Sequence, residues 1–193
     1  PDELFEVTLK MDGSSTTFYV RPNDEGVVET GVCSSNLELK TDESNADNLF
    51  VKMYNELNIG SELKAFYART GRSVAIQGEL WGEGINGNWE GVKGVNFNVF
   101  DVFDCDKHCY VSTYERWNIL AELGLFNKHV PIFAVGTLSE LGLETLKIED
   151  FLSFADRPSI HNKIAEGVVF KSLSEPNFTF KVINTGYLLN GGE

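Results

Sequence analysis

A lysine at the end of a strand-like segment is the first residue whose setting suggests chemistry. Residues 10–15 read Lys-Met-Asp-Gly-Ser-Ser, so the turn leaves the Lys10 amine beside several backbone and hydroxyl donors. Donors gathered in such a turn can together hold a phosphate group. A lysine ahead of a Gly-Ser turn is usually an ordinary solvated strand residue, so the chemical interpretation needs supporting residues elsewhere in the chain.

A glutamate opens a second apolar segment and offers one such residue. Glu166 precedes Gly-Val-Val-Phe, where an unpaired carboxylate would be costly to bury. The pattern fits a ligand, direct or through water, for Mg²⁺ or Mn²⁺, because these ions prefer oxygen. The alternative is a salt-bridged glutamate at a strand end. Asp12 has two interpretations as well, since it could help to hold the metal or cap the turn in which it lies.

The spacing of apolar residues predicts the elements that position these side chains. The sequence predicts strands over residues 5–11, 16–20, 74–81, 97–103, 130–135, 166–171 and 178–183; residues 5–11, 74–81 and 178–183 alternate, whereas 97–103 and 166–171 are strongly apolar. The first two should form a hairpin. Helical periodicity and caps predict helices over 46–57, 61–71 and 112–124, and one or two short helices in 138–155. Frequent hairpin spacing without regular βαβ alternation predicts an α+β fold with antiparallel sheets flanked by helices.

Composition limits the class of protein. No apolar run approaches the ~20 residues that a membrane span needs, so no membrane partner is expected. Three unevenly placed cysteines argue against a disulfide framework and favour a reducing, intracellular compartment. The net charge of −13 counts against a nucleic-acid partner. RNA binding would therefore require a local basic groove or contacts from a further segment.

Six short motifs, in order along nearly the whole chain, resemble those of the covalent nucleotidyltransferase superfamily of ATP-dependent ligases and mRNA-capping enzymes, and most closely those of RNA ligases. They are Lys10–Gly13 (motif I), Val32–Asn36 (Ia), Gly78–Leu80 (III), Val99–Val102 (IIIa), Glu166–Val169 (IV) and Phe180–Ile183 (V). Each motif is weak alone, whereas all six in order are strong. The resemblance implies one adenylyltransferase domain, of the ATP-grasp-like ligase type, over residues 1–193. Because the chain opens without Met, directly before the motif I strand, we expect a fragment of a longer ligase.

The resemblance also implies a reaction and its site. Lys10 would attack the α-phosphate of ATP and carry AMP, which passes to an RNA 5′-phosphate before a 3′-OH seals the nick. The implied nucleotide-binding residues are Lys10, Asn36, Glu79, Phe100, Glu166, Lys171 and Lys181. Among these, Glu79 would bind the ribose and Phe100 would stack on adenine, while Glu166 and Asp12 would hold Mg²⁺ or Mn²⁺. The implied partner is RNA with 5′-phosphate and 3′-OH ends, as a nicked duplex, bound by a monomer in the cytoplasm or nucleus, or in the host cytoplasm for a viral protein.

Elementary chemistry supports catalytic roles for Lys10 and Lys181. A free lysine has a pKa of ~10.4, so the Lys10 amine must lose a proton before it can attack. Neighbouring positive charge, from a metal or from Lys181, would favour that loss and attract the α-phosphate. Lys181 would also neutralise the charge that builds on the non-bridging oxygens. The alternatives are an exposed strand lysine at 181 and a core position for Phe100, beside Phe97 and Phe103.

Two departures from the motifs keep other functions open. Ser35 stands where close relatives usually carry the arginine of motif Ia, and Thr179 stands at the first of the two lysines that motif V often carries. Lys171 could compensate by reaching the β- and γ-phosphates. The Ser35 departure leaves open a nucleotide- or RNA-end-binding module with impaired catalysis. A DNA ligase and a GTP-using capping enzyme, which share the lysine chemistry, are further alternatives.

Overall fold

The computed structural model describes residues 3–191 and divides the chain into two compact units. The first unit comprises the chain up to Gly13, Trp81–Gly94 and the chain from Val130 onward. The second comprises Ser14–Leu80 and Val95–His129. Each unit is thus built from segments that are distant in the sequence. The expectation that residues 1–193 form a single domain stays a prediction.

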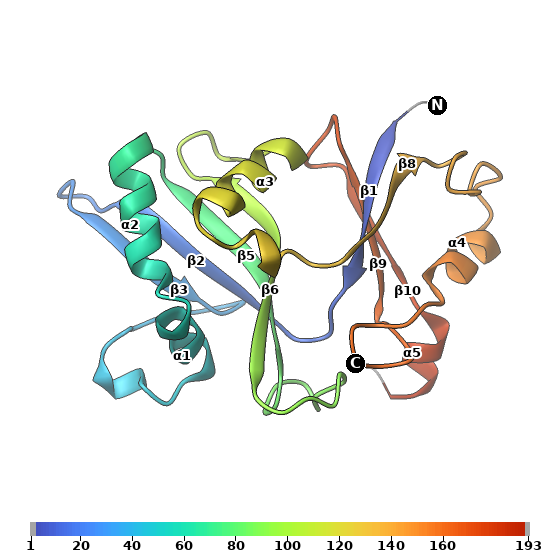
Figure 1. Cartoon of the computed structure of the whole chain (residues 1–193), viewed down its shortest axis with the longest axis horizontal. Helices are drawn as coiled ribbons and strands as arrows, with labels where there is room; N and C mark the ends of the chain where they lie inside the picture. Colours follow the sequence, from blue (N-terminus) through green and yellow to red (C-terminus); the bar gives the residue numbers. More distant parts are fainter. Residues whose placement is uncertain (1–2, 192–193) are drawn as a thin grey trace. The chain divides into compact units, whose positions relative to one another are not determined.

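The first unit is built on a four-stranded antiparallel sheet in the order β10-β9-β1-β8. Its elements are β1 (Leu4–Lys10), β8 (Ile132–Thr137), α4 (Ile148–Ala155), β9 (Gly167–Ser172), β10 (Thr179–Ile183) and α5 (Thr185–Leu189). Alternation in β1 sends Phe5 and Val7 into an apolar core with Val168 and Phe170. Helix α4 packs on this side of the sheet and contacts β10 (Figure 1). The opposite side of β1, β9 and β10 is therefore left for polar residues.

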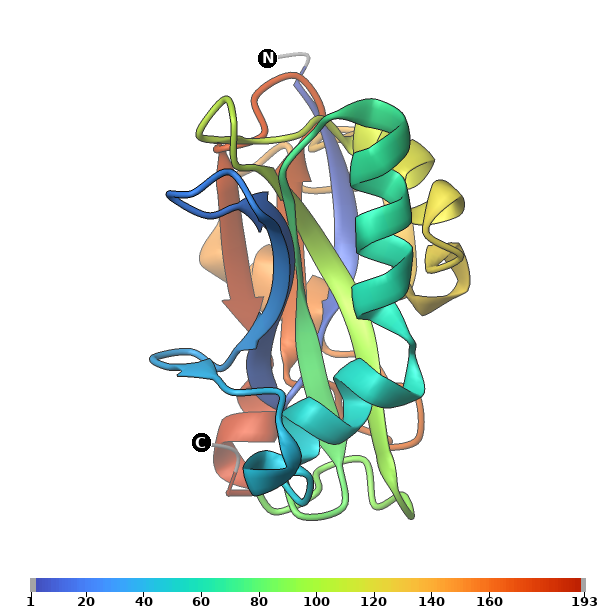
Figure 2. The same cartoon turned by 90° about the vertical axis from the view of Figure 1, so that its left-hand side faces the viewer.

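The second unit holds a six-stranded sheet in the order β4-β3-β2-β5-β6-β7. Its strands are β2 (Ser14–Pro22), β3 (Val28–Cys33), β4 (Glu38–Leu39), β5 (Val74–Gly82), β6 (Val95–Asp104) and β7 (Cys109–Tyr110), and its helices are η1 (Glu43–Asn45), α1 (Leu49–Glu56), α2 (Ile59–Thr70), α3 (Thr113–Glu122) and η2 (Phe126–Lys128). Helix α2 runs along one face of this sheet and contacts β2 and β3 (Figure 2). The ring of Phe18 lies 4.9 Å from that of Phe97 beneath the helices. Within residues 3–191, no helix combines the length and apolar character needed to cross a membrane.

The α+β class with antiparallel sheets is confirmed, but the predicted hairpin of residues 5–11 and 16–20 is wrong. Strand β1 pairs with β8 and β9, whereas β2 pairs with β3 and β5 in the other sheet. Both strands bury apolar side chains at the centre of different sheets, so β1 pairs with distant strands and not with β2 across the short turn. Helix α2 ends at Gly71 and α3 is capped by Ser112, both as predicted.

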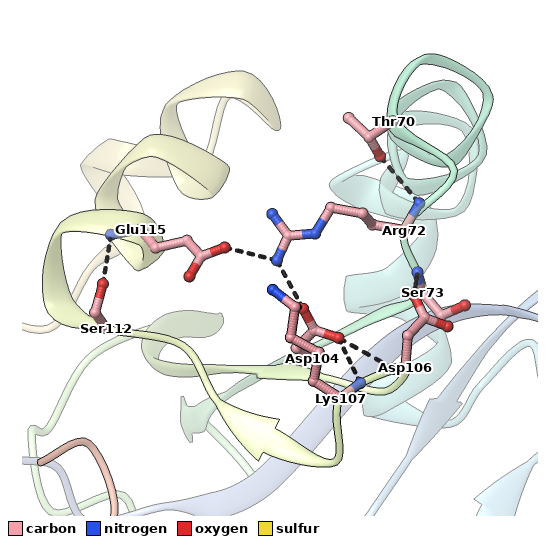
Figure 3. Close-up of polar contacts among 8 residues, drawn as sticks. All are labelled: Thr70, Arg72, Ser73, Asp104, Asp106, Lys107, Ser112 and Glu115. Carbon is pink, nitrogen blue, oxygen red and sulfur yellow. Dashed lines mark hydrogen bonds and ion pairs between the residues drawn. The ribbon is translucent and has the colours of Figure 1, made fainter.

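A charged network fixes three segments of the second unit (Figure 3). The guanidinium of Arg72, just after α2, lies 2.8 Å from Asp104 Oδ2 and 2.7 Å from Glu115 Oε1. The backbone N–H of Lys107 donates to Asp104 Oδ1 at 2.9 Å. Burial tends to raise the pKa of the Asp104 carboxyl, but the Lys107 N–H and the Arg72 charge outweigh it and hold that pKa below its usual value. The network joins the end of α2 to the end of β6 and the start of α3.

Candidate active site

The register of β1, β9 and β10 brings most of the predicted phosphate-binding residues to one face of the four-stranded sheet. Opposed residues form three rows across these strands: Lys10–Gly167–Ile183, Thr8–Val169–Lys181 and Glu6–Lys171–Thr179. Residues directly opposite each other in antiparallel strands share a face. Lys10, Lys171 and Lys181 therefore all lie on the face opposite the apolar core. Lys181 is one row from Lys10, and its side chain is exposed.

The predicted nucleophile and the predicted metal ligand are in contact. Lys10 Nζ lies 2.5 Å from Glu166 Oε1, although 156 positions separate the two residues in the sequence. The Lys10 side chain is 23% exposed and that of Glu166 is 10% exposed. Burial raises the pKa of the Glu166 carboxyl; the contact with Lys10 and the charge of Lys181 oppose the rise, while Asp12 adds to it. The structure thus brings Lys10, Asp12, Glu166 and Lys181 into one electrostatic site.

One oxygen of Glu166 is suited to a cation. Its Oε2 is buried and accepts no hydrogen bond. Such an oxygen costs free energy unless it meets a donor or a metal ion. Mg²⁺ is commonly held by one or two carboxylates together with substrate phosphates, and Asp12 offers the second carboxylate. Among residues 3–191 there is no cluster of three or more His, Cys, Asp or Glu that could hold a metal without such help. The residues present therefore fit a cation that is shared with a nucleotide.

Backbone contacts hold Glu166 at the end of the β9–β10 strand pair. The Asn184 N–H donates to the Glu166 carbonyl at 2.9 Å, one step beyond the pairing of Ile183 with Gly167. A Cβ at position 167 would lie 2.2 Å from the Val182 carbonyl oxygen, so only glycine allows this approach of the two strands. The glycine that follows Glu166 is therefore required by the pairing that positions the carboxylate.

Lys171 lies away from the Lys10–Glu166 pair. It is four residues beyond Gly167, which corresponds to about 13 Å along the strand at ~3.3 Å per residue. Lys171 is buried and stands directly opposite Glu6, a buried carboxylate. The structure thus places this lysine beside an acid and not beside Lys10. Its contact with the β- and γ-phosphates stays a prediction.

The two predicted nucleoside contacts lie on one face of the six-stranded sheet. A Cβ at Gly78 would touch the ring of Phe97, and Phe97 packs on Phe18, which in turn meets Tyr54 of α1. Gly78 and Phe97 therefore face the helices. Glu79 is one residue along β5 from Gly78, and Phe100 is three along β6 from Phe97, so both point to the other face. Phe97 is fully buried and Phe100 is not, which separates Phe100 from the core phenylalanine.

Asn36 is exposed, together with Ser35, in the turn between β3 and β4. The Ser34 N–H donates to the Leu37 carbonyl at 2.9 Å and closes the turn. On β4, Glu38 accepts a hydrogen bond from the hydroxyl of Tyr19 on β2, two strands away in the sheet. This contact fastens the hairpin that carries Asn36. The role of Asn36 towards the nucleotide stays a prediction.

The motif order and this site geometry agree with the comparison against known families. The RNA ligase family model matches residues 3–183. The chain belongs to the RNA ligase family.

Solved RNA ligases from Naegleria gruberi are similar over almost the whole chain. A variant with ATP and Mn matches with a TM-score of 0.81 and 35% identity, over 97% of this chain and 51% of that one. A variant with AMP and Mn matches with a TM-score of 0.81 and 35% identity, over 98% of this chain and 52% of that one. A complex with pyrophosphate matches with a TM-score of 0.80 and 35% identity, over 97% of this chain and 51% of that one. The chain thus spans about half the length of these relatives. A search among curated proteins gave no significant match.

In this member of the RNA ligase family, Asn86 holds the turn after Lys10, a contact that the sequence did not predict. The side-chain Nδ2 of Asn86 donates to the Gly13 carbonyl at 2.5 Å and lies 3.4 Å from Asp12 Oδ1. The run of glycine and asparagine around Asn86 indicates a loop with left-handed residues, and Asn86 has φ 41°. That composition predicts the loop but not its distant partner, so Asn86 could not be assigned from the sequence.

Proposed function

We propose that this chain transfers AMP from ATP to its own Lys10, as the first step of ATP-dependent RNA ligation. The Lys10–Glu166 contact carries the proposal, because it places an accessible amine at a strand end beside a buried carboxylate with one oxygen to spare. Glu166 and Asp12 would hold Mg²⁺ or Mn²⁺, and the cation would supply positive charge to the triphosphate. The Naegleria structures with ATP, AMP, pyrophosphate and Mn support the same chemistry for this chain.

The residues of the sheet face have separate parts in this step. Lys10 contacts Glu166 before reaction, and the amine would become a nucleophile after it passes one proton to solvent. Glu166 and Asp12 would hold the cation, whose positive charge would favour the loss of that proton. The Lys10 nitrogen then forms a bond to the α-phosphorus. The bond from that phosphorus to the oxygen bridging to the β-phosphate breaks, and pyrophosphate leaves with the electron pair. Lys181, one row away, would neutralise the charge on the non-bridging oxygens.

Nucleoside recognition is assigned to the second unit. Phe100 would stack on adenine and Glu79 would accept hydrogen bonds from the ribose hydroxyls, while Asn36 would add a polar contact to the nucleotide. Lys171 would act on the β- and γ-phosphates. Support for the roles of Phe100, Glu79 and Asn36 comes from their motif positions and, for Phe100, from its partial exposure on the sheet face away from the helices. Lys171 lies outside the motifs and is proposed as a substitute for the motif V lysine that is replaced by Thr179.

The later steps would use RNA. A 5′-phosphate oxygen would attack the lysyl–AMP phosphorus and restore the Lys10 amine, and a 3′-OH would then displace AMP to join the strands. Membership of the RNA ligase family supports RNA as the substrate class. A nicked duplex, a monomeric enzyme and an intracellular setting complete the proposal, and the three free cysteines support the last of these.

Two assays test the proposed function. In the first, the protein is incubated with radiolabelled ATP or GTP and Mg²⁺ or Mn²⁺, and the label that stays on the denatured protein is measured. We expect label from ATP and none from GTP; label from GTP alone would indicate a capping-type enzyme and contradict the proposal. In the second, nicked duplexes carry RNA or DNA on the 3′-OH side. Sealing that is faster with DNA would contradict the RNA assignment.

A second candidate function rests on Ser35. It lies exposed beside Asn36 at the position where the motif of close relatives has an arginine, so one phosphate-binding charge is lacking there. A nucleotide- or RNA-end-binding module would bind ATP without forming an adduct. Measurable ATP binding with no covalent label at any metal concentration would favour this candidate over catalysis.

A further inference from the structure

The loop between β5 and β6 contacts both the turn after Lys10 and the segment before Glu166. On one side, Asn86 donates to the Gly13 carbonyl and approaches the Asp12 carboxylate, in the turn directly after Lys10. On the other side, the next residues of the loop hold the segment that leads into Glu166. All of these residues belong to the first unit.

The contacts to the segment before Glu166 are numerous and largely buried. The Glu90 carboxylate, itself 5% exposed, accepts hydrogen bonds from the Ser159 hydroxyl, from the His161 N–H at 2.7 Å and from the Asn162 N–H at 3.2 Å. The neighbouring Trp89 donates from its indole nitrogen to the Ile164 carbonyl at 2.7 Å. Charge-assisted bonds from several donors to one buried carboxylate are stronger than neutral ones, so residues 159–164 are held firmly against the loop.

The loop has a fixed conformation of its own. Its base is closed by the Glu83 N–H, which donates to the Gly94 carbonyl at 2.9 Å. Asn86 and Asn88 both adopt positive φ, at 41° and 55°, which asparagine tolerates better than most residues. The Asn88 side chain bonds within the loop, donating to the Val92 carbonyl at 2.8 Å and accepting from the Val92 N–H at 3.2 Å. Asn86 instead directs its amide out of the loop to the motif I turn.

We propose that Asn86 is a positioning residue for AMP transfer to Lys10. Its amide fixes the Gly13 carbonyl, and thereby the turn that orients the Lys10 amine and the Asp12 carboxylate relative to Glu166. The inference rests on the proposed function of that site. A neutral donor suits the place: a carboxylate at position 86 would add repulsion to Asp12, and a lysine would pair with Asp12 in competition with the cation.

The test compares Asn86→Gly with Asn88→Gly. Both substitutions replace a left-handed asparagine of the same loop with a residue that adopts that conformation freely, so the backbone effect is matched. Two quantities are measured for each protein: the rate of AMP-adduct formation at saturating ATP and Mn²⁺, together with the KM for ATP, and the hydrogen exchange of the peptide that contains residues 11–15. The second quantity does not depend on activity.

We expect Asn86→Gly to slow adduct formation by about 10- to 100-fold, as for a displaced catalytic group, with little change in KM and with faster exchange in residues 11–15. Asn88→Gly removes two hydrogen bonds inside the loop but none to the motif I turn, so its effect on both quantities should be clearly smaller than that of Asn86→Gly. Equal effects of the two variants, or unchanged exchange in Asn86→Gly, would overturn the positioning role. If the wild type forms no adduct while only Asn86→Gly speeds the exchange, the proposed function fails and the positioning of the turn stands.

Discussion

The two oxygens of Glu166 have different surroundings: Oε1 lies 2.5 Å from the Lys10 amine, whereas Oε2 is buried and accepts no hydrogen bond. The Lys10 amine thus satisfies Oε1, whereas Oε2 is available to a ligand. A buried carboxylate with one unbonded oxygen lowers the stability of the fold, because the free-energy cost of burying its charge is not fully offset within the protein.

Glu166→Gln should abolish AMP transfer without destabilising the fold at neutral pH. The pKa of Glu166 is raised above its usual value of 4.5, so the folded protein binds a proton there more readily than the unfolded chain does. Its ionisation therefore lowers stability as pH rises from 4.5 through the folded pKa, and the neutral amide avoids this loss. Thermal unfolding should show a melting temperature at pH 7 equal to or above that of the wild type. The difference should vanish below pH 4.5, where both side chains are neutral.

A clear drop in the melting temperature of Glu166→Gln at pH 7 would show that the main role of the Lys10–Glu166 ion pair is to stabilise the fold. Robust adduct formation by this variant, or by the wild type in excess chelator, would contradict the metal role of Glu166.

Phe100→Ala and Phe97→Ala should separate nucleotide recognition from core packing. Phe97 is buried against Phe18, and its truncation should cost about 3–5 kcal/mol of unfolding free energy. Phe100 points to the face away from the helices, and its truncation should weaken ATP use by roughly 1–3 kcal/mol, the range for a lost stack on a base. Denaturant unfolding and the KM for ATP measure the two effects. If Phe100→Ala changes stability and leaves the KM unchanged, adenine is bound elsewhere.

Asp104→Asn should weaken the second unit in a pH-dependent way. The pKa of Asp104 is held below its usual value of 3.8, so its charge stabilises the fold above that pH, and this contribution is lost as pH falls through the folded pKa. At pH 7 the variant should lose roughly 1–3 kcal/mol, since the buried hydrogen bonds to Lys107 N–H and Arg72 are weakened. Lys107→Ala is the matched control, because its exposed amine lies 3.5 Å from Asp104 and should contribute under about 1 kcal/mol. A loss that persists unchanged at pH 3 would show that the charge is not its source.

Alternation predicted β1 and β10, an apolar run predicted β9, and the resemblance of the motifs selected the residues that are proposed to carry the chemistry. The rows that place Lys181 on the same face as Lys10, two strands away, and Lys171 opposite Glu6 could not be predicted, because register depends on which strands pair. The wrong hairpin of β1 with β2 has the same cause. A turn with Gly13 is compatible with a hairpin, but β1 pairs with β8 and β9 far along the chain, whereas β2 pairs with the next strand, β3, and with β5.

Local signals succeeded where the physics is local. Ser112 and Gly71 were predicted as helix ends because capping and left-handed geometry involve only neighbouring residues. The contact of Asn86 could not be predicted from the sequence, because its partners Asp12 and Gly13 are more than 70 residues away along the chain. The resemblance of the motifs bridged part of this gap by selecting Glu79 and Phe100, which periodicity alone did not distinguish from other strand residues.

The central claim is that Lys10 becomes covalently attached to AMP, and an intact-mass spectrum tests it most directly. The protein is incubated with ATP and Mn²⁺ beside Lys10→Ala and Lys10→Arg, the second of which keeps a positive charge for Glu166 but removes the amine nucleophile. We predict a gain of about 329 Da for the wild type, carried by the peptide that contains Lys10, and no gain for either folded variant. An adduct that persists on either variant, or that maps to another residue of the wild type, would contradict the account.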